Sequence, residues 1–142
     1  MSVNTLFSAP SPLAASALVA VGGAAGSVLR YQLGRWAAHL ASPANTFPWG
    51  TLAINILGSL LMGALLGWLA RGTSGAAQGE SLRLLVGVGL LGGFTTFSAF
   101  SAELVTMMHR GQAGLAAGYA AASLIAGMAA VIIGLIAAQS AT

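Results

Sequence analysis

The chain has 142 residues, of which 57% are hydrophobic and only 5% are charged. Soluble domains carry about 25% charged residues, so five Arg, two Glu and no Lys are too few to cover a water-exposed surface. The net charge of +3 reflects a scarcity of acids, and a soluble globule, a disordered tail and a nucleic-acid binder with a basic patch are all excluded. Because Cys is absent, disulfides, thiol nucleophiles and thiolate metal sites are excluded too. The composition predicts an integral membrane protein.

The charged residues divide the chain into apolar stretches that are long enough to cross a bilayer. A helix needs about 20 apolar residues to cross a hydrocarbon core about 30 Å thick. We expect four such helices, at roughly 12–38, 48–70, 82–109 and 112–138. The sequence SPANTFP at residues 42–48 is typical of a turn between the first two. The short links predict an all-α, multi-pass membrane protein with a single domain over residues 1–142.

The first apolar stretch could also be a cleaved signal peptide. No Lys or Arg precedes it, so the basic segment that opens such peptides is missing. The helical pattern also continues through Arg30 to Trp36 without a clear stop. We therefore expect the first helix to be retained.

The Arg residues are almost evenly divided between the two sides of the membrane. Arg30, Arg35 and Arg110 fall on one side, and Arg71 and Arg83 fall on the other. Membrane orientation follows a clear bias of Lys and Arg toward the cytoplasm, and that bias is nearly absent in this chain. Insertion in both directions would produce an antiparallel dimer with two-fold symmetry. A single topology, set by the weak bias or by the insertion machinery, is an equally open alternative.

Small residues recur at the spacing of helix contacts. The chain has 20 Gly, and four pairs are spaced by four residues: Gly22/Gly26, Gly63/Gly67, Gly89/Gly93 and Gly114/Gly118. The last helix extends its pair into a stripe: Gly114, Gly118, Ala122, Ala126, Ala130 and Gly134. In a membrane, small residues allow helix backbones to approach closely. These pairs predict packing contacts, some within the subunit and some between subunits.

Few titratable side chains are candidates for chemistry. His39 and His109 fall near membrane boundaries, without acids at ligand spacing, and we expect them to be interfacial. Glu80 lies among Gly and Ser and is expected to be solvated in a loop. Glu103 lies near the end of the third span, where it could carry protons or pair with an Arg or a polar backbone group.

A hydroxyl-rich segment occupies the middle of the third span. Residues 89–101 read GLLGGFTTFSAFS, in which two adjacent Gly are followed by Thr-Thr. This pattern predicts a break in the helix, which is tolerated at mid-membrane only where it is buried in protein or lines a cavity. The freed carbonyls of a broken helix can bind a cation, and helix N-termini favour anions. The alternative is a kinked helix whose Ser and Thr bond back to the backbone.

Other polar or aromatic side chains are placed to line an ion path. Phe97 and Phe100 share a helix face, and the positive edges of two rings could contact an anion without trapping it. Asn55 in the second span offers two N–H donors, to another helix or to a passing anion. Tyr119 and Ser123, four residues apart in the last helix, form a short polar stripe.

Three segments together resemble one known family. They are residues 22–31 (GGAAGSVLRY), 50–58 (GTLAINILG) and, the most specific, 92–103 (GGFTTFSAFSAE). In this order and in a chain with four spans, they resemble the Fluc (CrcB) fluoride channels over nearly the whole length. The sequence departs from the family pattern at Ala99, where a Thr is usual between the two Phe.

The resemblance implies a passive, fluoride-selective channel in the cell (inner or plasma) membrane that exports fluoride and lowers its cytoplasmic level. It also implies an antiparallel, dual-topology homodimer with a structural Na⁺ at its centre. By position in the motif, backbone carbonyls of Gly92 and Thr95 from each subunit would hold this ion. Arg30 would mark a positive vestibule. The resemblance carries the fluoride path over to Asn55, Phe97, Phe100, Ser123 and Tyr119.

Two other functions compete with a channel. A small dual-topology multidrug or cation exporter needs an acid deep in its first span, and residues 12–38 contain none. A structural assembly subunit would conduct no ions, and it would leave the Asn and the hydroxyl groups at mid-membrane unexplained. We expect a protein that is not an enzyme, because no hydrolytic or redox constellation is present.

Overall fold

The computed structural model describes residues 9–40, 47–72 and 75–141. Its helices are α1 (Pro12–Leu40), α2 (Trp49–Ala70), α3 (Ala76–Leu82), the π-helix η2 (Arg83–Leu91), α4 (Gly92–Phe94), α5 (Phe97–His109) and α6 (Ala113–Ser140). The described part of the chain contains no strand. Of the turn expected at 42–48, residues 42–46 lie outside the described residues.

Four helical segments are long and apolar enough to cross a membrane, which confirms an all-α fold with four candidate spans. They are Pro12–His39, Trp49–Ala70, Ala76–His109 and Ala113–Ser140. The third begins before residue 82 because α3 continues directly into η2. Even the shortest, with 22 residues, is about 33 Å long, enough for a hydrocarbon core about 30 Å thick.

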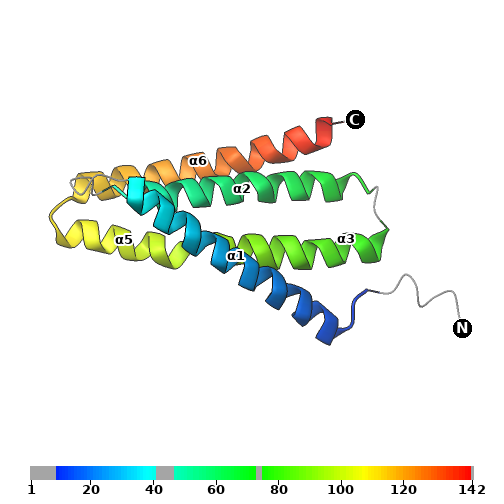
Figure 1. Ribbon diagram of the computed structural model, residues 1–142. Coiled ribbons are helices and arrows are strands. Elements are labelled where there is room, and N and C mark those ends of the chain that lie inside the picture. The colour runs from blue at the N-terminus through cyan, green and yellow to red at the C-terminus, as the bar shows by residue number, and fades with distance from the viewer. Residues whose placement is uncertain (1–8, 41–46, 73–74, 142) are drawn as a thin grey trace, which may run out of the picture.

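The spans form two layers, with α2 and α6 side by side (Figure 1). The row from α3 to α5 runs below them, and α1 crosses this row obliquely. The first turn of α1, the last turn of α6, the end of α2 and the start of α3 lie at one end of the molecule. The turn between α5 and α6 lies at the other end. Arg110 and Arg71 are therefore at opposite ends of the bundle.

Glycines bring α1 against η2 at backbone distance. A Cβ added to Gly22 would overlap the Leu85 carbonyl, and one added to Gly26 would overlap the Leu90 carbonyl. The added atom at Gly89 would meet the Val19 carbonyl at 2.9 Å. Side chains at these positions would push the two helices apart, so the predicted packing role of these glycines is confirmed.

Glycines also bring the backbones of α2 and α6 together, but along only part of the last helix. An added Cβ would overlap the Val131 carbonyl at Gly63 and the Leu60 carbonyl at Gly134. At Gly114 and Gly118 the added atom would meet nothing within 4 Å. The stripe predicted along α6 therefore makes close backbone contacts within the subunit at Gly134, in its C-terminal half, and not at Gly114 or Gly118.

One cluster of buried apolar side chains lies toward the end of the molecule where α5 meets α6. It contains Leu52, Met107, Ala116 and Tyr119, with Phe100 packed against it. Elsewhere large apolar side chains point outward: Val21, Leu124 and Ile125 are 65%, 63% and 71% exposed. A surface of this kind suits lipid or a partner helix and would be costly in water.

Candidate ion pathway

Two extended residues separate α4 from α5. Thr95 has φ −79° and ψ 159°, and Thr96 has φ −149° and ψ 116°, both in the β region. In a continuous α-helix the N–H of Thr96 would donate to the carbonyl of Gly92, and the N–H of Ala99 to that of Thr95. Both donors have other partners in this structure.

The Asn55 side chain of α2 forms hydrogen bonds with both the N–H and the carbonyl of Thr96. Asn55 Oδ1 accepts from the Thr96 N–H at 2.9 Å, and Asn55 Nδ2 donates to the Thr96 carbonyl at 3.2 Å. The Ala99 N–H donates to Thr96 Oγ1 at 3.2 Å, so Thr96 caps α5. The carbonyls of Gly92 and Thr95 consequently lose their helical donors.

Hydroxyl groups also bond back to the helix backbone beside these two residues. Thr95 Oγ1 donates to the Leu91 carbonyl at 2.9 Å, and Ser101 Oγ donates to the Phe97 carbonyl at 2.9 Å. The two alternatives that the sequence left open are therefore compatible. The hydroxyl groups donate hydrogen bonds to nearby carbonyls of their own helix, while Asn55 bonds the backbone of the extended Thr96.

A groove of about 320 Å³ brings together most of the side chains that the sequence singled out for an ion path. Its lining includes Asn55, Thr95, Thr96, Phe97, Phe100 and Ser123. The two Phe rings lie 5.8 Å apart between centroids and are tilted by 45°. Phe97 is 80% exposed, so its ring stands at the open side of the groove.

A second cavity, of about 490 Å³, lies between α1, α2 and α5. Among its lining residues are Arg30, Thr51, Trp49, Thr96 and Glu103. The predicted vestibule residue Arg30 thus lines a cavity together with three polar residues from other parts of the chain, Thr51, Thr96 and Glu103. Thr96 borders both this cavity and the groove, so the residue held by Asn55 lies in the wall between them.

Glu103 is held by two hydroxyl groups, a role that sequence reasoning missed. Thr51 Oγ1 donates to Glu103 Oε1 at 2.5 Å, and Tyr119 Oη donates to Glu103 Oε2 at 2.8 Å. The expected partners were an Arg or a backbone group. The available signal was an acid within an apolar span, which requires donors from other helices. Thr51, one turn before Asn55, was not singled out.

Tyr119 and Ser123 occupy different surroundings on α6. Tyr119 is fully buried, with its ring 5.1 Å from that of Phe100 and 5.4 Å from that of Phe47. Ser123 lines the groove. Its buried Oγ lies beside the Tyr119 hydroxyl but makes no hydrogen bond of good geometry among the described residues. The Ser123 hydroxyl is therefore a buried polar group at the wall of the groove, without a hydrogen-bond partner in the part of the chain that the structure describes.

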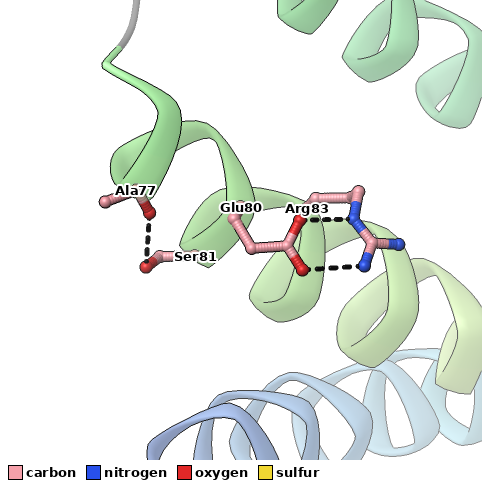
Figure 2. A network of polar contacts seen from close by, with 4 residues as sticks. All are labelled: Ala77, Glu80, Ser81 and Arg83. Atoms are coloured by element: carbon pink, nitrogen blue, oxygen red, sulfur yellow. Dashed lines mark hydrogen bonds and ion pairs between the residues drawn. The ribbon is translucent and has the colours of Figure 1, made fainter. Parts of the chain in front are cut away.

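The remaining charged side chains lie apart from these cavities. Glu80 was expected in a loop, but it lies in α3, where Arg83 Nε and Nη2 donate to its carboxylate at 2.8 Å and 2.9 Å (Figure 2). The loop expectation was wrong because α3 extends the third span toward its N-terminal side. In the same turn Ser81 donates to the Ala77 carbonyl at 2.9 Å. His39 and His109 are exposed, near and at the ends of their helices.

Known proteins match this chain over most of its length. The family described as CrcB-like protein, Camphor Resistance (CrcB), matches residues 17–135. A fluoride-specific ion channel FluC of Novosphingobium aromaticivorans is 58% identical over 123 residues, covering 87% of this chain and 94% of the relative. Proteins of the same name from Erythrobacter litoralis and Caulobacter vibrioides are 53% and 45% identical, covering 87% and 86% of this chain and 91% and 93% of their own lengths. The chain belongs to the CrcB family, as its three motifs indicate.

Proposed function

We propose that this protein is a fluoride-selective, passive ion channel of the cell membrane that lets fluoride leave the cytoplasm. The observation that carries the proposal is the groove in which Asn55, Phe97, Phe100 and Ser123 meet beside the extended residues. Relatives named as fluoride-specific ion channels are identical to this chain at more than half of the aligned positions, which supports a channel function.

The groove offers the interactions that a small, strongly hydrated anion needs. A channel must replace the hydration shell with donors while keeping each site weak enough to release the ion. The positive ring edges of Phe97 and Phe100 and the hydroxyl of Ser123 supply weak contacts. The first N–H groups of α5 point away from the helix toward Thr96, where a helix terminus favours negative charge.

The second cavity fits the role of a vestibule. Arg30 supplies a positive charge there, and a positive charge at a cavity wall raises the local concentration of anions. The Glu103 carboxylate shares its charge with two hydroxyl donors, Thr51 and Tyr119, which lessens its repulsion of an anion. We propose that fluoride passes from this vestibule along the wall at Thr96 into the groove.

The membrane potential is sufficient to drive export. Moving one elementary charge through 100 mV corresponds to about 2.3 kcal/mol. Hydrogen fluoride that enters from a weakly acidic medium ionises inside, and the resulting anion is expelled by a negative interior. No coupled ion and no energy source other than the potential is required.

We propose that two copies associate as an antiparallel homodimer. The groove is polar in part and opens at the subunit surface beside the 80% exposed ring of Phe97. Lipid cannot hydrogen-bond the exposed polar groups of a break, so a second protein surface is the favourable cover. The near-even division of the Arg residues is compatible with insertion in both directions.

We further propose a structural Na⁺ held by the carbonyls of Gly92 and Thr95. These residues fit the ion, because both carbonyls lose their helical donors when Thr96 and Ala99 bond elsewhere, and hard cations prefer oxygen ligands. When bound, the ion would add positive potential near the groove. Replacing Na⁺ on both sides of a proteoliposome by a large organic cation is expected to lower fluoride flux, and unchanged flux would count against the site.

Efflux from liposomes tests the function directly. Purified protein is reconstituted, the vesicles are loaded with fluoride or chloride, and efflux is followed with ion-selective electrodes. The channel predicts rapid fluoride efflux, little chloride efflux and no requirement for a proton gradient. A cation exporter predicts proton-coupled transport of an organic cation, although no acid is present in α1, and an assembly subunit predicts no flux.

A further inference from the structure

A single amide side chain of α2 holds both backbone polar groups of Thr96, one of the two extended residues in the third span. Asn55 Oδ1 accepts from the N–H of Thr96, and Asn55 Nδ2 donates to the carbonyl of the same residue. An adjacent strand makes the same pair of bonds to an extended residue. The Asn55 amide therefore substitutes for a neighbouring backbone where none is available.

One turn later on α2, a glycine makes room for the other extended residue. A Cβ added to Gly58 would overlap Cγ2 of Thr95 and would approach Cδ1 of Phe94 at 3.3 Å. Gly58 is itself buried. The two positions lie three residues apart and thus on one face of α2, which contacts Thr96 through Asn55 and Thr95 through Gly58.

We propose that Asn55 and Gly58 are positioning residues that hold Thr95 and Thr96 extended, so that α2 acts as a template for the interruption. Asn55 then serves the pathway chiefly through Thr96 and not only as a donor to the ion. This inference rests on the proposed channel function for its consequence in flux, but the template itself is a structural claim that can be tested separately.

Removing the template frees Thr95 and Thr96 to leave the extended conformation. Without Asn55, the Thr96 N–H and carbonyl lose their fixed partners, so this segment opens to exchange and reaches the continuous helix, with Thr96 N–H bonded to the Gly92 carbonyl, only transiently. Two residues that change from extended to helical shorten the segment by about 3.6 Å. The rings of Phe97 and Phe100 follow Thr96 directly, so they would leave the groove, and the wall between the two cavities would move with them.

Hydrogen–deuterium exchange of the purified protein tests the template without measuring transport. Asn55→Leu keeps the approximate size of the side chain and removes both bonds. We expect exchange in peptides that cover residues 92–100 to rise roughly tenfold or more, as expected for the loss of two hydrogen bonds. Peptides from α6 should exchange as in the wild type. Phe97→Ile is the matched control, because it removes a groove side chain and leaves both Asn55 bonds in place.

Each outcome of this experiment decides for or against the template. An unchanged exchange rate at 92–100 in Asn55→Leu overturns it and leaves Asn55 as an ion ligand only. A uniform rise in all peptides also overturns it, since that pattern reports general loosening. If Asn55→Leu does not yield folded protein, Asn55→Asp replaces it: the acceptor for the Thr96 N–H remains and the donor is lost, so a smaller local rise is expected. No local rise in that variant overturns the proposal.

The Gly58 contact provides a rescue experiment with flux as the measurement. Gly58→Ala should lower fluoride efflux at least about tenfold because its methyl group displaces Thr95, whose branched side chain adapts poorly. Adding Thr95→Ser removes Cγ2, and the double variant should recover much of the flux. Full flux in Gly58→Ala, or no recovery in the double variant, overturns the role of Gly58. If the wild type conducts no fluoride, the proposed function fails, while the exchange experiment still decides on the template.

Discussion

At the scale of single residues, the two Phe rings of the groove have different structural roles. Phe97 is 80% exposed, whereas Phe100 is partly buried and packs against the ring of Tyr119 at 5.1 Å. Their spacing in the sequence shows that they share a helix face but not that only one of them supports the core. The consequence is that Phe97 can be changed with less effect on the fold of the subunit.

Replacement of Phe97 by Ile tests the role of this ring in the ion pathway separately from its role in packing. Ile retains apolarity but lacks the ring quadrupole, so we expect Phe97→Ile to reduce fluoride efflux at least about tenfold with little change in the midpoint of thermal unfolding. Phe100→Ile should reduce efflux and also lower stability by about 1 kcal/mol, since it loses an aromatic pair. Liposome efflux, size-exclusion profile and thermal unfolding are measured for each. A monodisperse Phe97→Ile protein with full efflux would remove that ring from the pathway.

At the scale of elements, glycine determines which helices touch along their backbones. Gly22 and Gly23 are adjacent on α1, yet only the first lies against a backbone atom of η2 closely enough to exclude a methyl group. The sequence identified both as parts of a glycine-rich segment. Only the rotation of α1 against η2 distinguishes them, because neighbouring residues of a helix point about 100° apart.

This difference predicts unequal effects from two substitutions of the same kind. Gly22→Ala places a methyl group on the Leu85 carbonyl, and overpacking of this kind costs about 1–3 kcal/mol. Gly23→Ala would meet the Gly89 carbonyl at 3.9 Å, an ordinary contact, and should be near neutral. Thermal unfolding of the two variants in the same detergent is compared with the wild type. Equal midpoints would show that α1 does not pack on η2 as described.

At the scale of the whole molecule, the four candidate spans of the described residues place the first turn of α1 and the last turn of α6 at the same end of the bundle (Figure 1). A tag after α6 therefore reports the orientation of every subunit. The near balance of Arg residues gives the insertion machinery little preference for either direction.

We expect a C-terminal tag to be accessible from both faces of the membrane in the same cells. Protease added to spheroplasts, and separately to inverted vesicles, should in each case cleave a substantial fraction of the tag. Adding Arg residues beside the first turn of α6 should shift the population toward one orientation and reduce flux, because an antiparallel pair needs both. Cleavage from one side only in the unmodified protein would contradict the dimer that we propose.

Much of this architecture follows from the sequence alone. Apolar runs bounded by charges predict the spans because lipid admits no uncompensated polar groups over its hydrocarbon thickness. The pair Thr95-Thr96 after two Gly predicts a break, since hydroxyl residues and Gly weaken a helix there. The motif at residues 92–103 indicates the family, which the relatives then confirm.

Only the tertiary structure decided which groups satisfy one another. Asn55 and Thr96 are 41 residues apart, Thr51 and Glu103 are 52 apart, and the spacing along the chain contains no information about either pair. The same holds for Gly58, whose lack of a side chain matters only because Thr95 lies against it. A sequence pattern reports the period of one helix and the medium that surrounds it. The partner of a buried polar group depends on how separate helices are rotated and shifted against one another, and this is determined by packing in three dimensions.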